Sequence, residues 1–99
     1  MGVVPVDGQR YIFQAYPRAA WVANARVTPT ATLTSGRRSS PIALVEVPVE
    51  ERRLLLLRQL RAVPGTGTLL VSGGLVADPA PETVAAAAER IAVFRIDAP

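Results

Sequence analysis

The sequence predicts an α+β domain, mainly β, whose antiparallel strands form a small barrel or a curled sheet. Two pairs of strand-like runs are each joined by a glycine turn, at Asp7-Gly8 and at Gly36-Arg37-Arg38, and such short turns connect antiparallel strands. Helical patterns over 50–63 and 80–90 then precede a last apolar run. The predicted order is therefore β-β-α-β-β-α-α-β, with two or three short helices beside the sheet.

Length and composition indicate one domain over residues 1–99. About half of the residues (49%) are hydrophobic, which is enough for one compact core. A domain of this size buries only about 60–65% of its unfolded surface, so pairing into a homodimer would help it. No apolar run reaches the roughly 18 residues that cross a bilayer. We therefore expect a cytoplasmic protein without a membrane span.

The basic residues are dispersed along the chain. All eleven are arginine, and the formal net charge is only +3. Nucleic-acid binding usually needs a basic stripe that faces the phosphates, often with aromatic residues beside it. The pattern is more typical of solvated surface arginines, so we expect no nucleic-acid partner.

The first element is a hairpin. The runs 2–6 and 9–16 read as strands, and the Asp7-Gly8 pair between them is the strongest short hairpin signal. Pro5 cannot donate a ladder hydrogen bond, so the first strand is expected at an edge of the sheet.

A short helix is predicted over 18–26. Pro17 fits the first turn, where its missing N–H is not needed, and Thr28-Pro29 ends the helix because the residue before a proline avoids helical geometry. Four residues fall on one flank at helical spacing: Ala20, Trp21, Asn24 and Ala25.

A second hairpin is predicted from 30–35 and 39–47. The segment 42–47 is almost continuously apolar, which predicts a strand buried on both faces. Pro48 ends it. The segment Ser35–Ser40 therefore forms a hairpin tip, where Arg37-Arg38 is expected to be solvated.

The clearest helix is predicted over 50–63, with acidic residues in its first turn and arginines near its end. Its inward stripe consists of Leu56, Leu57, Leu60 and Val63. The segment 66–76 is ambiguous: residues 69–71 suit a short strand, but the surrounding glycines favour a mobile excursion.

The last third begins with Asp78-Pro79, which predicts an N-cap followed by proline in the first turn of a helix over 80–90. The final strand, 91–97, is apolar apart from Arg95 and is expected inside the sheet. A carboxylate partner is expected for Arg95, since an unpaired buried charge is costly.

Little of the sequence can carry chemistry by itself. The chain has no histidine and no cysteine, which excludes the usual hydrolytic triads and the usual zinc ligands. The acids are scattered, so no metal site is expected. Gly65-Thr66-Gly67-Thr68 lacks the Gly-Lys-Ser/Thr ending of a phosphate loop and follows a helix. Either the protein is not a catalyst, or a bound cofactor supplies the chemistry.

Five blocks, in order, resemble the deazaflavin (F420)-dependent nitroreductase family. They are DGQRYIF, WVANAR, ATLTSGRRSSPIALVEVP, VEERRLLLLRQL and AAAAERIAVFRID. The resemblance implies a split β-barrel, related to the FMN-binding barrels of the pyridoxamine-phosphate-oxidase type. It also implies hydride transfer from reduced coenzyme F420 to a small-molecule redox substrate, a quinone or a nitro-aromatic acceptor. FMN is the less favoured cofactor.

The family's strand-to-helix corner lies along its coenzyme. Carried over to this sequence, the resemblance implies a cofactor site formed by Gln14, Ala15, Tyr16, Trp21, Val22 and Asn24. Loop amides suit a heterocycle edge, and an indole offers a flat apolar wall. Each residue also has a structural interpretation: Trp21 as a core anchor, Asn24 as a local cap and Tyr16 as a turn residue.

The 99 residues lack one family feature, the basic Arg-x-Ser-Gly segment upstream of the first conserved strand. This absence suggests a short paralogue, a truncated reading frame or a barrel that a partner chain completes. Ser35–Ser40 resembles that segment only superficially. A second hypothesis therefore stands beside the enzyme: a non-catalytic, degenerate split barrel that binds a small molecule or a protein.

Overall fold

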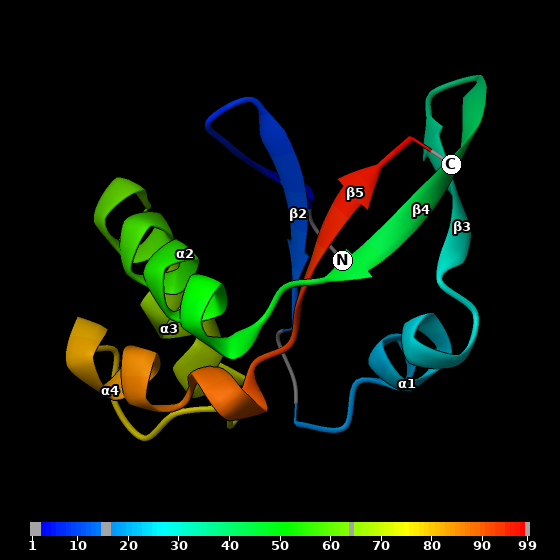
Figure 1. Cartoon of the computed structure of the whole chain (residues 1–99). Helices are drawn as coiled ribbons and strands as arrows, with labels where there is room; N and C mark the ends of the chain where they lie inside the picture. The colour runs from blue at the N-terminus through cyan, green and yellow to red at the C-terminus, as the bar shows by residue number, and fades with distance from the viewer. Residues whose placement is uncertain (1–2, 15–16, 64, 99) are drawn as a thin grey trace.

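The computed structural model describes residues 3–14, 17–63 and 65–98 and contains an open five-stranded sheet flanked by helices (Figure 1). The strand order is β1-β2-β5-β4-β3, and every neighbouring pair is antiparallel. The strands are β1 (Val3–Val6), β2 (Gln9–Phe13), β3 (Thr30–Ser35), β4 (Arg38–Glu46) and β5 (Val93–Asp97). The helices are α1 (Ala20–Val27), α2 (Val49–Ala62), α3 (Gly65–Ser72), α4 (Pro81–Ala86) and the 3₁₀ helix η1 (Ala88–Arg90).

The predicted α+β class and antiparallel sheet are confirmed, but the prediction of a mainly β domain was wrong, because in the described ranges the helices cover more residues than the strands. The described part of the chain holds four α-helices and one 3₁₀ helix, so the prediction of two or three helices was too low. The sheet ends at β1 and β3, and within the described ranges no ladder joins these two edges.

The first hairpin forms as predicted. Asp7 and Gly8 both have positive φ angles, 48° and 79°, the pattern of a type I′ turn. Pro5 lies in β1, which is an edge strand. The second strand is shorter than the predicted 9–16, because its ladder ends at Phe13.

The helix α1 begins two residues later than predicted. Its N-cap is Ala19, whose backbone is extended (φ −68°, ψ 113°), so Pro17 precedes the helix instead of forming its first turn. The predicted end is confirmed, since the helix stops at Val27 and the Thr28 N–H donates to the Asn24 carbonyl at 2.8 Å.

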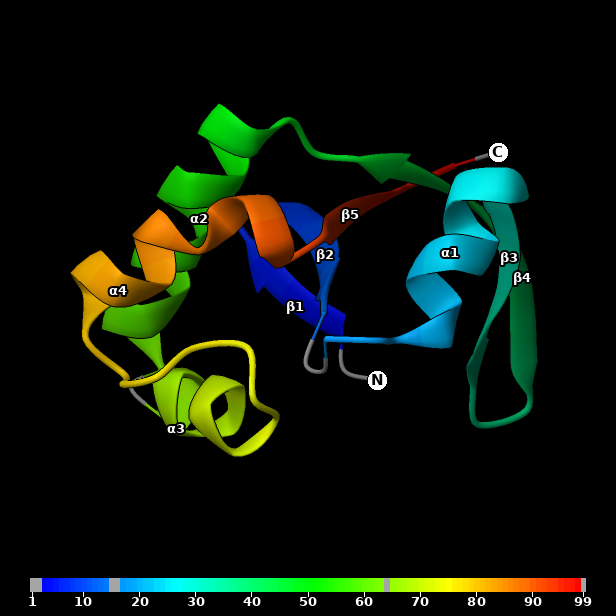
Figure 2. The same ribbon diagram turned by 90° about the horizontal axis from the view of Figure 1, so that it is seen from below.

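The second hairpin has a two-residue loop, Gly36-Arg37, because Ser35 pairs with Arg38. Gly36 has a φ of 60°. The prediction that 42–47 is buried on both faces was wrong, because Val45 is 38% exposed. Figures 1 and 2 show why: α2, α3 and α4 gather at the β2 end of the sheet, whereas α1 lies against the β3–β4 hairpin.

The predicted span of α2 is confirmed to within one residue. The predicted inward stripe of apolar side chains is confirmed only in part. Leu56 and Leu60 are buried, Leu57 is half-buried and Val63 is 50% exposed. The inward face instead includes two polar side chains, Arg52 and Gln59.

The segment after α2 is a helix, α3, and neither a strand nor an irregular excursion. Its glycine content lowers helix propensity, yet Gly67 allows a close approach: a Cβ there would lie 2.9 Å from Pro79 Cβ. Asp78 is not an N-cap. It accepts the Ala80 N–H at 2.9 Å, and the helix α4 begins at Pro81.

The central strand is β5, as predicted, although it starts at Val93 instead of residue 91. Arg95 donates to the Asp97 carboxylate at 2.8 Å, which confirms its expected carboxylate partner. The core has one part under α2–α4, around Leu56 and Ile91, and another under α1, around Phe94. None of the helices in the described ranges has the length and apolar character to cross a membrane.

Candidate functional site

The helix α1 separates two clefts. The larger, of about 640 Å³, lies between the start of α1, Gly74-Leu75 and Glu89-Arg90. The smaller, of about 450 Å³, lies between α1 and the β3–β4 hairpin. Among the residues that the structure describes, none lines both clefts. The face of α1 on which a side chain lies therefore decides which cleft it serves.

Trp21 is both a core contact and a cleft wall. Its ring packs edge-on against Phe94, with centroids 5.5 Å apart and an angle of 62° between the planes, a favoured aromatic arrangement. The side chain is half-buried and lines the smaller cleft. The core-anchor interpretation of Trp21 is confirmed, and its role beside a coenzyme stays a prediction.

The smaller cleft is mainly apolar. Ala31 and Leu33 of β3 lie on the same face as Ile42 of β4, which pairs with Ala31. Its polar lining consists of Asn24, Thr28, Thr30, Thr32 and the Trp21 indole. The residues that the structure assigns to this lining include no ionisable side chain. Such a cleft can bind and orient a molecule by shape and neutral hydrogen bonds, but its described lining offers no ionisable acid or base.

Asn24 is exposed and lies in this cleft beside Trp21. Its main-chain carbonyl ends α1 by accepting the Thr28 N–H. Within the described ranges its side-chain amide has no hydrogen-bond partner, so the local capping expected for it comes from the backbone.

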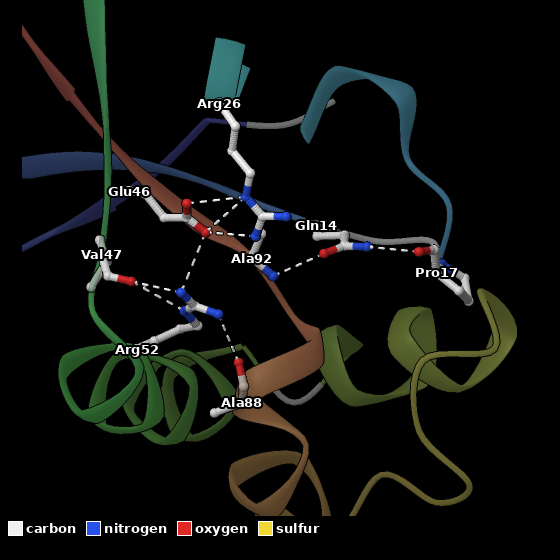
Figure 3. A network of polar contacts seen from close by, with 8 residues as sticks. All are labelled: Gln14, Pro17, Arg26, Glu46, Val47, Arg52, Ala88 and Ala92. Carbon is white, nitrogen blue, oxygen red and sulfur yellow. Dashed lines mark hydrogen bonds and ion pairs between the residues drawn. The ribbon is translucent and has the colours of Figure 1, made fainter. Parts of the chain in front are cut away.

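Gln14 and Val22 lie on the larger cleft instead. The Gln14 side chain is 6% exposed, accepts the Ala92 N–H at 2.9 Å and donates to the Pro17 carbonyl at 3.3 Å (Figure 3). Val22 is buried against Phe94 and Ala92. Gln14 therefore ties the end of β2 to the start of β5. Ala15 and Tyr16, also predicted for the site, lie outside the described residues.

A polar network joins α1 to α2 and η1 (Figure 3). Arg26 holds the Glu46 carboxylate with Nη2–Oε2 at 2.7 Å, and Arg52 reaches the same oxygen at 3.5 Å. The hydrogen bond from Arg26 lowers the pKa of Glu46 and raises that of Arg26. Arg52 itself is buried and donates to the Val47 and Ala88 carbonyls.

Sequence reasoning missed Arg52. The residue falls one turn before Leu56 on the inward face, but a hydrophobic-periodicity pattern counts arginine as exposed. Its burial depends on the carbonyls of Val47, just before the helix, and of Ala88 in η1, and the hydrophobic periodicity of α2 shows neither contact.

No family model, curated protein or solved structure matches the chain.

Proposed function

We propose that the smaller cleft binds the flat ring of a redox coenzyme, and that the chain is a deazaflavin-dependent oxidoreductase of the nitroreductase or quinone-reductase type. One observation carries the proposal: the half-buried Trp21 ring, held against Phe94, forms a wall of an apolar cleft of about 450 Å³. Ligand pockets of roughly 300–1,000 Å³ with apolar walls and a few polar groups are typical of cofactor sites.

The lining fits the ring of such a coenzyme better than its charged tail. Asn24 supplies a neutral side-chain amide for a heterocycle edge. A phosphate tail needs cationic partners, and the described lining of this cleft contains no arginine. The tail would therefore be held from outside this set of residues. FMN also carries a phosphate, and the motif resemblance favours coenzyme F420 over it.

The chemistry would come from the cofactor. When bound, reduced deazaflavin supplies a hydride, which with one proton from solvent converts a quinone to a hydroquinone while the coenzyme is oxidised. The protein would exclude water from the cleft with Leu33, Ile42 and Leu44, and would hold the ring against Trp21.

We further propose that the open sheet is part of a split barrel completed in a homodimer. The sheet has two edge strands, β1 and β3. Val45 in β4 is apolar and 38% exposed. Light scattering during size-exclusion chromatography should give the mass of a dimer.

A second function, a non-catalytic binding module, is favoured by a different observation. Gln14, which the motif resemblance places at the coenzyme, uses its side-chain amide to join Ala92 to Pro17. It also lies on the cleft opposite to that of Trp21. A degenerate barrel would bind a small molecule in the smaller cleft without turnover.

A single titration tests binding. Trp21 is the only tryptophan, so quenching of its emission by oxidised coenzyme F420 or by FMN reports on this cleft. We expect saturable quenching, strongest with F420, which is lost in Ala31→Phe because the new ring fills the cleft. Thr34→Phe, on the same strand but outside the lining, should bind as the wild type does. Absence of saturable quenching by either coenzyme would refute a cofactor site here.

Turnover separates the two functions. The wild type, mixed with reduced F420 and a quinone, should oxidise the coenzyme faster than the protein-free mixture does, and Ala31→Phe should lose that acceleration. Binding without acceleration, by a protein with a normal circular dichroism spectrum, would instead support the binding module.

A further inference from the structure

The larger cleft, on the opposite side of α1, has a different chemical character. Three arginines line it, Arg18, Arg26 and Arg90, together with one acid, Glu89. Three positive charges against one negative leave its described lining with an excess of two positive charges. A cleft that is lined by several positively charged side chains attracts small anions.

Two of these arginines are available to a ligand. Arg26 already binds the Glu46 carboxylate through both Nε and Nη2. Arg18 and Arg90 are exposed, and within residues 3–14, 17–63 and 65–98 neither guanidinium group makes a hydrogen bond or an ion pair. Each guanidinium is a planar fork that matches two oxygens of a phosphate or a carboxylate. The pair enters the cleft from separate segments, one before α1 and one in η1.

The remainder of the lining is apolar. The buried side chains of Val22 and Leu75 form part of the wall of the cleft. Two alanines of α1, Ala20 and Ala23, also line it. The positive end of the α1 dipole also lies there, since the N-cap residue Ala19 lines the cleft. An inorganic anion would contact only the arginines. An organic molecule with an anionic group would contact both the arginines and the apolar wall.

We propose that the larger cleft binds a small organic phosphate, with the phosphate between Arg18 and Arg90 and its apolar part against Val22 and Leu75. A phosphate monoester carries up to two negative charges, so it can interact with both Arg18 and Arg90, the two lining arginines that are not bound to Glu46. The site is independent of the proposed redox function, because the described linings of the two clefts have no residue in common.

Calorimetric titration at constant ionic strength tests this site with three probes. Phenyl phosphate should bind with a Kd of roughly 1 mM or tighter, because it has both the anionic group and an apolar ring. Inorganic phosphate should bind less tightly, because it lacks the ring. Benzoate has the ring with a single charge, so it too should be weaker; the reverse order would assign the site to carboxylates and overturn the phosphate proposal.

A charge-matched pair of variants locates the binding. Arg18→Gln/Arg90→Gln and Arg37→Gln/Arg38→Gln each lower the formal net charge from +3 by two. All four side chains are exposed, so both proteins should fold. The first variant should bind phenyl phosphate on the order of tenfold more weakly or worse, and the hairpin-tip variant should bind it within about twofold of wild type. Equal weakening in both variants would show a general charge effect and overturn the proposal.

The two sites can fail separately. Ala31→Phe fills only the smaller cleft, so it should lose coenzyme quenching and keep phenyl phosphate binding. Failure of the wild type to bind phenyl phosphate saturably would refute the phosphate site and leave the coenzyme proposal standing. Loss of phenyl phosphate binding in Ala31→Phe would contradict the assignment to the larger cleft.

Discussion

Arg52→Ala should be among the most destabilising single substitutions in this protein. The Arg52 side chain is only 6% exposed. Its guanidinium donates to the Val47 carbonyl from Nε (3.2 Å) and from Nη2 (2.9 Å), and to the Ala88 carbonyl from Nη1 (3.0 Å). These bonds join the end of β4 and the start of η1 to α2. Removing the side chain leaves both carbonyls without this donor.

The magnitude follows from those contacts. The Val47 carbonyl loses both of its bonds from Arg52, and the Ala88 carbonyl keeps only the longer bond from the Ile91 N–H, at 3.3 Å. A buried carbonyl that loses a partner costs about 1–3 kcal/mol, and the truncation also removes the packing of the buried arginine stem. Glu46 keeps Arg26, so no acid is left without a partner. We therefore expect a loss of about 3–4 kcal/mol in the free energy of unfolding, out of the 5–15 kcal/mol typical of native proteins. A loss of about 3 kcal/mol corresponds to a fall in Tm on the order of 12–24 °C.

Urea unfolding followed by circular dichroism measures this loss, with the neighbouring arginine as the control. Arg53 has a side chain that is 37% exposed and binds Glu50 on the surface of the same helix. It also donates to the Ala85 carbonyl at 3.3 Å, but that carbonyl also accepts the Ala87 N–H, so Arg53→Ala should cost about 1 kcal/mol or less. Arg52→Met keeps most of the buried stem and should lie between the two. Equal, small losses for Arg52→Ala and Arg53→Ala would refute the argument that these carbonyls depend on Arg52.

Three other outcomes are expected. The lowered pKa of Glu46, due mainly to the hydrogen bond from Arg26, stabilises the fold above the usual value of 4.5, and this contribution is lost as the pH falls through the lowered folded value. Glu46→Gln should therefore flatten the dependence of stability on pH below about 5, and an unchanged slope would contradict this. Gly67→Ala should lower Tm, because its Cβ would meet Pro79 at 2.9 Å, whereas Gly65→Ala, with open space around it, should leave Tm unchanged or raise it. Gln14→Ala should cost about 1–3 kcal/mol of stability in urea unfolding but leave coenzyme quenching of Trp21 unchanged; weakened quenching would place Gln14 in the coenzyme site.

Elements fixed by local chemistry could be predicted from the sequence. The turn at Asp7-Gly8 needs two residues with positive φ, and asparagine, aspartate and glycine accept that geometry most readily. The end of α1 before Pro29 follows from the sterics of proline alone. The central place of β5 followed from its nearly continuous apolar run.

Elements fixed by distant contacts could not. The segment containing Gly67 forms α3 because it packs closely on Leu60 and Pro79, and that contact overrides its low propensity. The α1 helix begins after Pro17, not at it, because Ala19 has an extended backbone.

For the candidate site, the sequence singled out the α1 corner and its tryptophan, and the structure places a cleft beside Trp21. The sequence could not show that α1 has a cleft on each side, because the wall opposite α1 in each cleft comes from a distant segment. The hairpin β3–β4 forms the far wall of the smaller cleft, and η1 helps to form that of the larger.

A backbone-amide NMR titration of the wild type with oxidised coenzyme F420 tests the central claim most directly. A ring held against Trp21 should shift the amides of Trp21, Asn24, Thr28 and Thr32 in a saturable way. The amides of Gly74 and Arg90, across α1, should stay in place. Saturable shifts confined to Gly74 and Arg90, or no saturable shifts at all, would contradict the assignment of the coenzyme ring to the smaller cleft.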